Sequence, residues 1–160
     1  MKALMAMLLF AASVQASSAR AEAATPSPLW GQWAVDVSRL PMPPQARPKS
    51  VTLTFSDAGP GKLTTQVDIV DAGGAKTHSV GTNPLDGTPV PVKDNIEADS
   101  AAMSMPAPNV LVMALGRNGG PASTRIFTVA KDGKSMVEMS AFTGDNGLPA
   151  MRTHYFTRVK

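Results

Sequence analysis

The stretch "SVTLTFSDAGPGKLTTQVDIV", from Ser50 to Val70, decides the fold class of this 160-residue chain. Apolar and polar residues alternate on both sides of the segment "DAGPG", and a period of two residues is typical of a β-strand with one buried face. The apolar face holds Val51, Leu53 and Phe55 before the turn and Leu63, Val67 and Ile69 after it. The stretch therefore predicts an antiparallel hairpin, because glycine supplies the positive φ that a tight turn needs.

Similar segments continue to the C-terminus, with the sequences "NVLVMAL", "STRIFTV", "SMVEMSAF" and "MRTHYFTRV". Between them lie Asp132-Gly133 and Asn146-Gly147, which we expect to form hairpin turns with positive φ at the glycines. No segment keeps the period of a helix, and two proline-containing segments, 40–50 and 83–94, interrupt the strands. The spacing predicts an all-β domain of about eight or nine strands in an antiparallel meander, as in a sandwich or barrel.

The N-terminus has the three-part layout of a secretory signal peptide. Lys2 precedes the apolar core "ALMAMLLFAASV", and small residues follow it. The pattern predicts a signal peptide over residues 1–21, a flexible lead-in over 22–28 and one domain over 29–160. The apolar core is shorter than the about 20 residues of a membrane span, so we expect a periplasmic or secreted protein without a span in its mature form.

The charge and cysteine content exclude some partners and some means of stabilisation. Without Lys2 and Arg20, 13 of the 15 basic residues remain against 12 acidic ones, a formal charge of +1. The basic residues form no run or stripe, so no nucleic-acid partner is expected. The chain has no cysteine, so an exported form must rely on core packing alone.

Enzymatic chemistry finds little support in the residue pattern. His78 and Ser79 are adjacent, and adjacent residues of a strand point to opposite faces, so His78 cannot serve Ser79 as a base. The chain has neither a G-x-S-x-G elbow nor a phosphate-binding glycine loop before a helix. We therefore predict no catalytic residue and no enzyme activity.

Metal and cofactor binding is equally unsupported. His78 and His154 lie far apart, and the acidic segment "DNIEADS" (94–100) lacks the spacing of a calcium loop, so it is expected to be a solvated loop. Met103 and Met105 have no histidine nearby and are expected to pack as apolar groups rather than to bind copper. No metal site and no cofactor are predicted.

The segment "MRTHYFTR" places several basic residues on one strand face, which holds Arg152, His154, Phe156 and Arg158. Such a face can bind an anion or form the polar outside of a barrel. The second interpretation is favoured here, because arginine is ordinarily exposed.

The order of several short motifs resembles a known family. These motifs are Gly31-x-Trp33, a proline-rich loop, "KSVTLT", "LDGTPVPV", "VAKDGK" and a last hairpin that contains "HYF". Over about residues 29–159 the chain is similar to small exported bacterial proteins with a lipocalin-like barrel, a family of largely unassigned function. The segment "GQWAVDVSRL" departs from the family pattern by a shorter spacing after the tryptophan. The resemblance implies an antiparallel up-and-down barrel of about eight strands and supplies no catalytic residues.

In such a barrel Trp33 is expected to pack across the closed end, while Trp30, of opposite parity, faces outward or caps that end. Val51 and Leu53 are expected on the inner face as well. The predicted ligand-binding residues are Trp33, Phe55, Val67, Met113, Phe127, Met139 and Tyr155. We expect a non-catalytic exported protein that binds a small apolar or amphipathic ligand. The main alternative is a structural or interaction protein of the cell envelope, with a filled barrel and a protein partner; a hydrolase-like enzyme ranks last.

Overall fold

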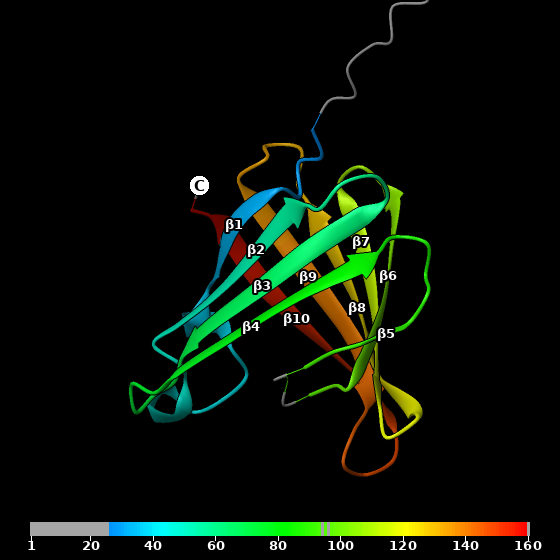
Figure 1. Cartoon of the computed structure of the whole chain (residues 1–160). Coiled ribbons are helices and arrows are strands. Elements are labelled where there is room, and N and C mark those ends of the chain that lie inside the picture. Colours follow the sequence, from blue (N-terminus) through cyan, green and yellow to red (C-terminus); the bar gives the residue numbers. More distant parts are fainter. Residues whose placement is uncertain (1–25, 94, 96, 160) are drawn as a thin grey trace, which may run out of the picture.

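The computed structural model describes residues 26–93, 95 and 97–159, which form one antiparallel sheet rolled into a barrel (Figure 1). The expected signal peptide over 1–21 lies outside the described residues. The sheet contains β1 (Gly31–Val35), β2 (Ser50–Asp57), β3 (Lys62–Val70), β4 (Lys76–Pro84), β5 (Val90–Pro91), β6 (Ser100–Ala107), β7 (Val110–Arg117), β8 (Gly120–Val129), β9 (Ser135–Thr143) and β10 (Pro149–Arg158).

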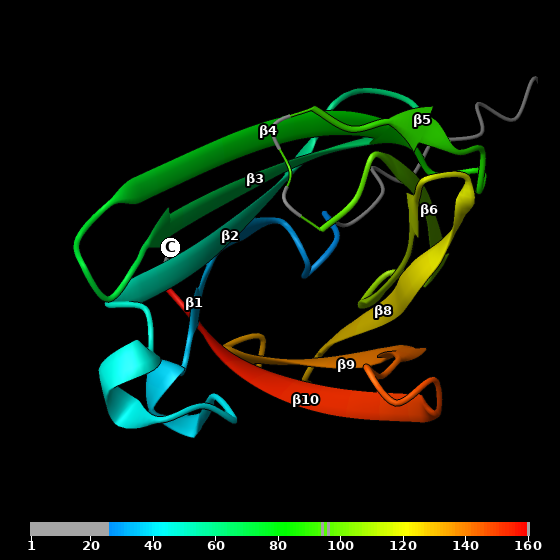
Figure 2. The same ribbon diagram turned by 90° about the horizontal axis from the view of Figure 1, so that it is seen from below.

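The strands follow one another as the meander predicted from the sequence. The order in the sheet is β4-β3-β2-β1-β10-β9-β8-β7-β6-β5, so consecutive strands pair except β4 with β5, and β1 also pairs with β10. Figure 2 shows the strands around a ring, with β3 and β4 opposite β9 and β10. The fold is an all-β, nearly closed up-and-down barrel.

The sheet has ten strands rather than about eight. β4 has the sequence "KTHSVGTNP", which is polar on both faces and gives no apolar alternation. β5 is two residues long and contains Pro91, which is tolerated because β5 is an edge strand. Both strands are therefore weakly marked in the sequence.

The connections follow the turn chemistry of the sequence. Gly133 and Gly147 have φ of 65° and 76°, which confirms the two predicted glycine turns. The proline-rich connection between β1 and β2 contains two short 3-10 helices, η1 (Val37–Arg39) and η2 (Pro44–Ala46). No helix in the described part of the chain is long and apolar enough to cross a membrane.

One end of the barrel, called here the closed end, is built around Trp33. Its side chain is fully buried, and its indole Nε1 donates to the Leu29 carbonyl at 2.9 Å. The buried core continues with Phe55, Leu63, Phe127, Met136 and Phe156. Trp30 is partly buried and packs against this core at the same end. The opposite end is called the open end below, because the inward-facing side chains of β2, β3, β9 and β10 there are partly buried or exposed.

Arg158 fixes the closed end from β10. Its guanidinium carbon lies 4.2 Å from the centre of the Trp33 ring, and its nitrogens donate to the carbonyls of Gly133 at 2.6 Å, Trp30 at 2.7 Å and Pro28. The guanidinium thus joins two separate backbone segments, residues 28–30 and the turn at Gly133, over an aromatic face. Arg158 lies opposite Trp33 in the sheet register, so it belongs to the inner face of the barrel.

Candidate ligand-binding site

The register of β8, β9 and β10 places polar side chains inside the barrel. Phe127 pairs with Glu138, and Glu138 pairs with His154, so these three residues share the face of the buried Phe127. One step toward the open end, Arg125 pairs with Ser140 on the same face. Residues directly opposite each other in adjacent strands point to the same side of a sheet. The inner face is therefore polar at this level.

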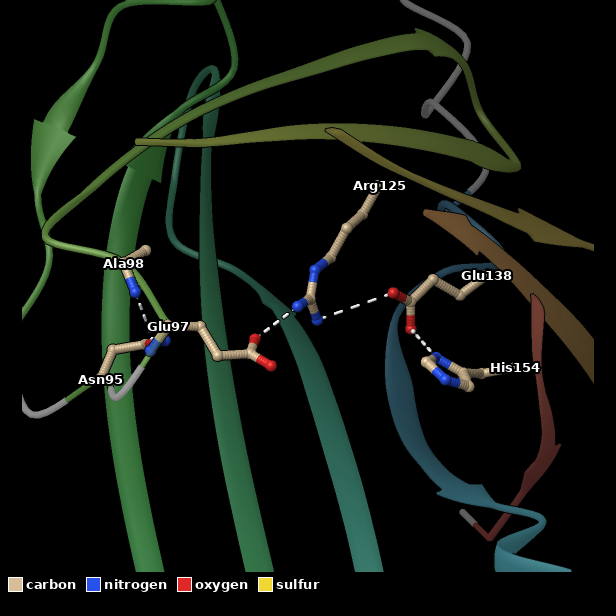
Figure 3. Close-up of polar contacts among 6 residues, drawn as sticks. All are labelled: Asn95, Glu97, Ala98, Arg125, Glu138 and His154. Atoms are coloured by element: carbon tan, nitrogen blue, oxygen red, sulfur yellow. Dashed lines mark hydrogen bonds and ion pairs between the residues drawn. The ribbon is translucent and has the colours of Figure 1, made fainter. Parts of the chain in front are cut away.

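Three of these side chains, called here the polar cluster, are joined by an ion pair and a hydrogen bond: Arg125, Glu138 and His154 (Figure 3). The Glu138 side chain is only 4% exposed. Its Oε2 lies 3.2 Å from His154 Nδ1, and its Oε1 lies 3.6 Å from Arg125 Nη1. Arg125 Nη2 also donates to Oε2 of Glu97, which precedes β6. A buried carboxylate needs such partners, because burying an unpaired charge is strongly unfavourable.

Several buried polar atoms on the inner face have no hydrogen-bond partner. They are Arg125 Nε, Glu138 Oε1 and, on β3, Thr65 Oγ1. A buried polar group without a hydrogen bond costs about 1–3 kcal/mol, so such groups are uncommon in folded proteins. Together the three atoms offer a donor, an acceptor and a hydroxyl to a polar group that enters the barrel.

Apolar side chains continue the inner face from this level toward the open end. Thr65 lies between the fully buried Leu63 and the partly buried Val67 on β3. Val51 and Ile69 pair with each other further along the same wall and are also partly exposed. The interior therefore has a filled apolar end, a polar level, and a partly accessible apolar wall.

Five of the seven residues predicted to bind a ligand lie on the inner face of the barrel. Trp33, Phe55, Met113 and Phe127 face inward but are buried in the core, and Val67 faces inward and is partly exposed. Val51 and Leu53 also lie on the inner face. Whether these residues contact a ligand remains a prediction.

Met139 and Tyr155 do not line the interior, so the expectation for these two is corrected. Met139 lies between the buried Glu138 and Ser140 and is 45% exposed on the outer face. Tyr155 precedes the buried Phe156, and Arg39 stacks on its outer side at 3.3 Å from the ring centre. Both residues have the opposite parity to the inner face.

The face of Arg152, His154, Phe156 and Arg158 is corrected too. It was expected on the outside, but it lies inside, because Phe156 pairs with the buried Met136. Arg152 lies nearest the open end and stacks on Phe142 at 4.6 Å from the ring centre. Exposure of arginine does not identify the outer face here, because Arg152 is exposed at the open end although it faces inward, and Arg158 is partly buried against Trp33 and backbone carbonyls.

Arg125 and Glu138 were not identified as site residues from the sequence, although the position of Arg125 relative to Phe127 indicates that Arg125 faces inward. Arg125 lies two residues before Phe127, so the assignment of Phe127 to the lining also places Arg125 inside. Glu97 was expected in a solvated loop; its side chain is 56% exposed, yet its carboxylate binds Arg125. Among the described residues, no three histidine, cysteine or acidic side chains gather in a way that could hold a metal ion.

No family model matches the sequence, and no curated protein matches it. Solved structures match the fold. A fatty-acid-binding protein of Schistosoma mansoni in complex with arachidonic acid has a TM-score of 0.57 and 14% identity, covering 84% of this chain and 98% of that chain. The wild-type fluorescent protein UnaG has a TM-score of 0.52 and 14% identity, with 81% and 96% covered. Zebrafish ileal bile-acid-binding protein with cholic acid has a TM-score of 0.51 and 13% identity, with 83% and 100% covered.

These identities are low, so the comparisons establish the fold alone. The chain has a barrel like those of fatty-acid-binding proteins, which agrees in coarse outline with the lipocalin-like barrel expected from the sequence.

Proposed function

We propose that this protein binds a small amphipathic molecule inside its barrel and performs no catalysis on it. The polar part of the ligand binds the polar cluster, and its apolar part lies along the inner faces of β2 and β3. The observation that carries the proposal is the Arg125–Glu138–His154 network, whose buried atoms Arg125 Nε and Glu138 Oε1 lack hydrogen-bond partners. Sites for small molecules typically combine mostly apolar walls with a few convergent polar groups.

The matched structures support a binding role. The Schistosoma mansoni protein holds arachidonic acid and the zebrafish protein holds cholic acid, and both ligands are acids with a large apolar part. We extend this ligand class, and only this class, to the present chain. We also propose a periplasmic or secreted location, supported by the signal-peptide layout of residues 1–21.

Native mass spectrometry of the protein purified from the periplasm of its own cells tests both parts of the proposal. The expected species is a chain that begins between Ser17 and Thr25 and carries a small organic molecule. A chain that retains Met1 would contradict export.

Nile red titration locates the binding surface independently of the natural ligand. Val67→Trp places a larger side chain on the partly exposed inner face of β3 and should weaken dye binding, whereas the matched Val80→Trp, on the exposed outer side of β4, should not. Equal melting temperatures of the two variants would show that neither has lost its fold. Unchanged dye binding by Val67→Trp would contradict a ligand inside the barrel.

A second candidate is an interaction protein of the cell envelope. The outer face supports it, because Val112, Ile126 and Met139 pair in a row across β7, β8 and β9, and Ile126 and Met139 are 40% and 45% exposed. Exposed apolar rows of this kind can bind partner proteins. The same titration separates the candidates, since dye binding that is lost in Met139→Lys but kept in Val67→Trp favours the outer face.

A further inference from the structure

Glu97 brings a second carboxylate to the polar cluster from the connection between β5 and β6. The Asn95 side chain fixes the backbone there, since its Oδ1 accepts from the amides of Glu97 at 2.8 Å and Ala98 at 3.1 Å. Ala98 is 5% exposed and belongs to the buried core. Figure 3 shows the Glu97 side chain extending from this anchored backbone to the guanidinium of Arg125.

The two carboxylates on Arg125 differ in how easily they can leave. Glu138 is 4% exposed and is also held by His154, so its departure would leave charges buried without a partner. Glu97 is 56% exposed, and water can replace Arg125 around its carboxylate. Exposed ion pairs contribute little to stability, so release of Glu97 is inexpensive.

Charge determines which ligand needs that release. With Glu97 in place, one guanidinium faces two carboxylates, and an incoming anion is repelled. With Glu97 away, Glu138 alone balances Arg125, and Nη2 becomes available next to the unpartnered Nε. An arginine that presents two adjacent N–H groups is well suited to bind a carboxylate with two hydrogen bonds. A neutral ligand gains nothing comparable from the release.

We propose that the Glu97 carboxylate occupies the position on Arg125 that a ligand carboxylate would take, and that it thereby determines which ligand head group the barrel accepts. A carboxylate amphiphile binds by displacing the Glu97 carboxylate, so that one carboxylate replaces another on the same guanidinium. Glu97 thereby lowers the affinity for anionic ligands and leaves that for neutral ones unchanged. This inference rests on the proposed function, because it concerns the same interior site.

Pyrenebutyric acid and the neutral pyrenebutanol provide a matched pair of fluorescent probes. Their dissociation constants are measured for the wild type, Glu97→Gln and Glu97→Ala. For the acid we expect the constant to fall about fivefold in both variants, the factor that corresponds to about 1 kcal/mol, the upper value for an exposed ion pair. For the alcohol we expect a change of less than about twofold.

Asp145→Asn is the matched control, because Asp145 is an exposed carboxylate in the β9–β10 turn, at the open end. If it tightens acid binding as much as Glu97→Gln does, the effect is one of overall charge and the inference is wrong. It is also wrong if both probes tighten equally, and the proposed function survives these two outcomes. If the alcohol binds while the acid binds no variant, the inference is wrong and so is the acidic ligand class proposed above, while binding inside the barrel stands. If neither probe binds any form of the protein, both proposals fall.

Discussion

At the scale of single residues, Arg158 and Arg152 differ although they share a strand and a face. Arg158 joins Pro28, Trp30 and Gly133 through their carbonyls while stacking on Trp33. Arg152 stacks on Phe142 near the open end and is exposed. Lysine keeps the charge of arginine but lacks its planar fork of donors, so only the first position should be sensitive to that exchange.

Arg158→Lys should therefore lower the free energy of unfolding by about 1–3 kcal/mol, since hydrogen bonds to partly buried carbonyls are lost. Arg152→Lys should change it by less than about 0.5 kcal/mol, as is usual for exposed positions. Urea denaturation of both variants measures the difference. Similar losses of unfolding free energy in the two variants would show that the guanidinium hydrogen bonds of Arg158 do not hold the closed end together.

At the scale of elements, the sequence predicts strands and turns better than it predicts which face is inside. On β2 and β3 the apolar face is the inner one, and its prediction from alternation is correct. On β9 the more apolar face, with Val137 and Met139, lies outside, while Glu138 and Ser140 lie inside. Apolar alternation identifies the inner face only where the interior is apolar.

The error on β9 continues into β10 because the two strands pair in a fixed register. Val137 pairs with Tyr155, so placing the face of Val137 and Met139 inside also places Tyr155 inside. The polar cluster was missed for the same reason: in sequence, its residues resemble the solvated side of a strand. Only the neighbouring Phe127 marked Arg125 as an inner-face residue.

The β8–β9 turn offers a test of the backbone at this scale. Gly133 has φ of 65°, and a Cβ added there would meet no atom within 4 Å, so Gly133→Ala probes backbone strain without a steric clash. We expect a loss of about 1 kcal/mol in unfolding free energy, because residues with a Cβ disfavour this region. Gly120→Ala, at the start of β8, has no positive φ and would place its Cβ 3.7 Å from the nearest atom, so it should cost less. Equal losses in thermal or urea unfolding would contradict this explanation.

At the scale of the whole molecule, the barrel has a seam that the strand pattern does not reveal. The sheet ends at β4 on one side and at the short β5 on the other, and these edges form no continuous ladder. A few contacts bridge the seam: Asn83 Nδ2 donates to the Ala101 carbonyl at 3.1 Å, the Gly87 amide donates to the Met103 carbonyl at 2.9 Å, and Asp86 forms a bridge with Ser104. These contacts join β6 to residues 83–87, a proline-containing segment that gives no strand signal in the sequence.

Asn83 should therefore stabilise the closed barrel more than its place near the end of a polar strand suggests. It is 2% exposed, and Asn83→Ala removes the seam hydrogen bond and leaves unfilled space, so we expect a loss of about 1–2 kcal/mol in unfolding free energy. Thr82→Ala, at the preceding position on β4, removes an exposed hydroxyl contact with Thr64 at 2.7 Å and should cost less than about 0.5 kcal/mol.

Hydrogen exchange adds a local readout, because release of the seam should expose the Gly87 amide while the β9–β10 ladder stays protected. Equal losses in the two variants, or unchanged exchange at Gly87, would mean that the barrel is held closed by its core and not by this side chain.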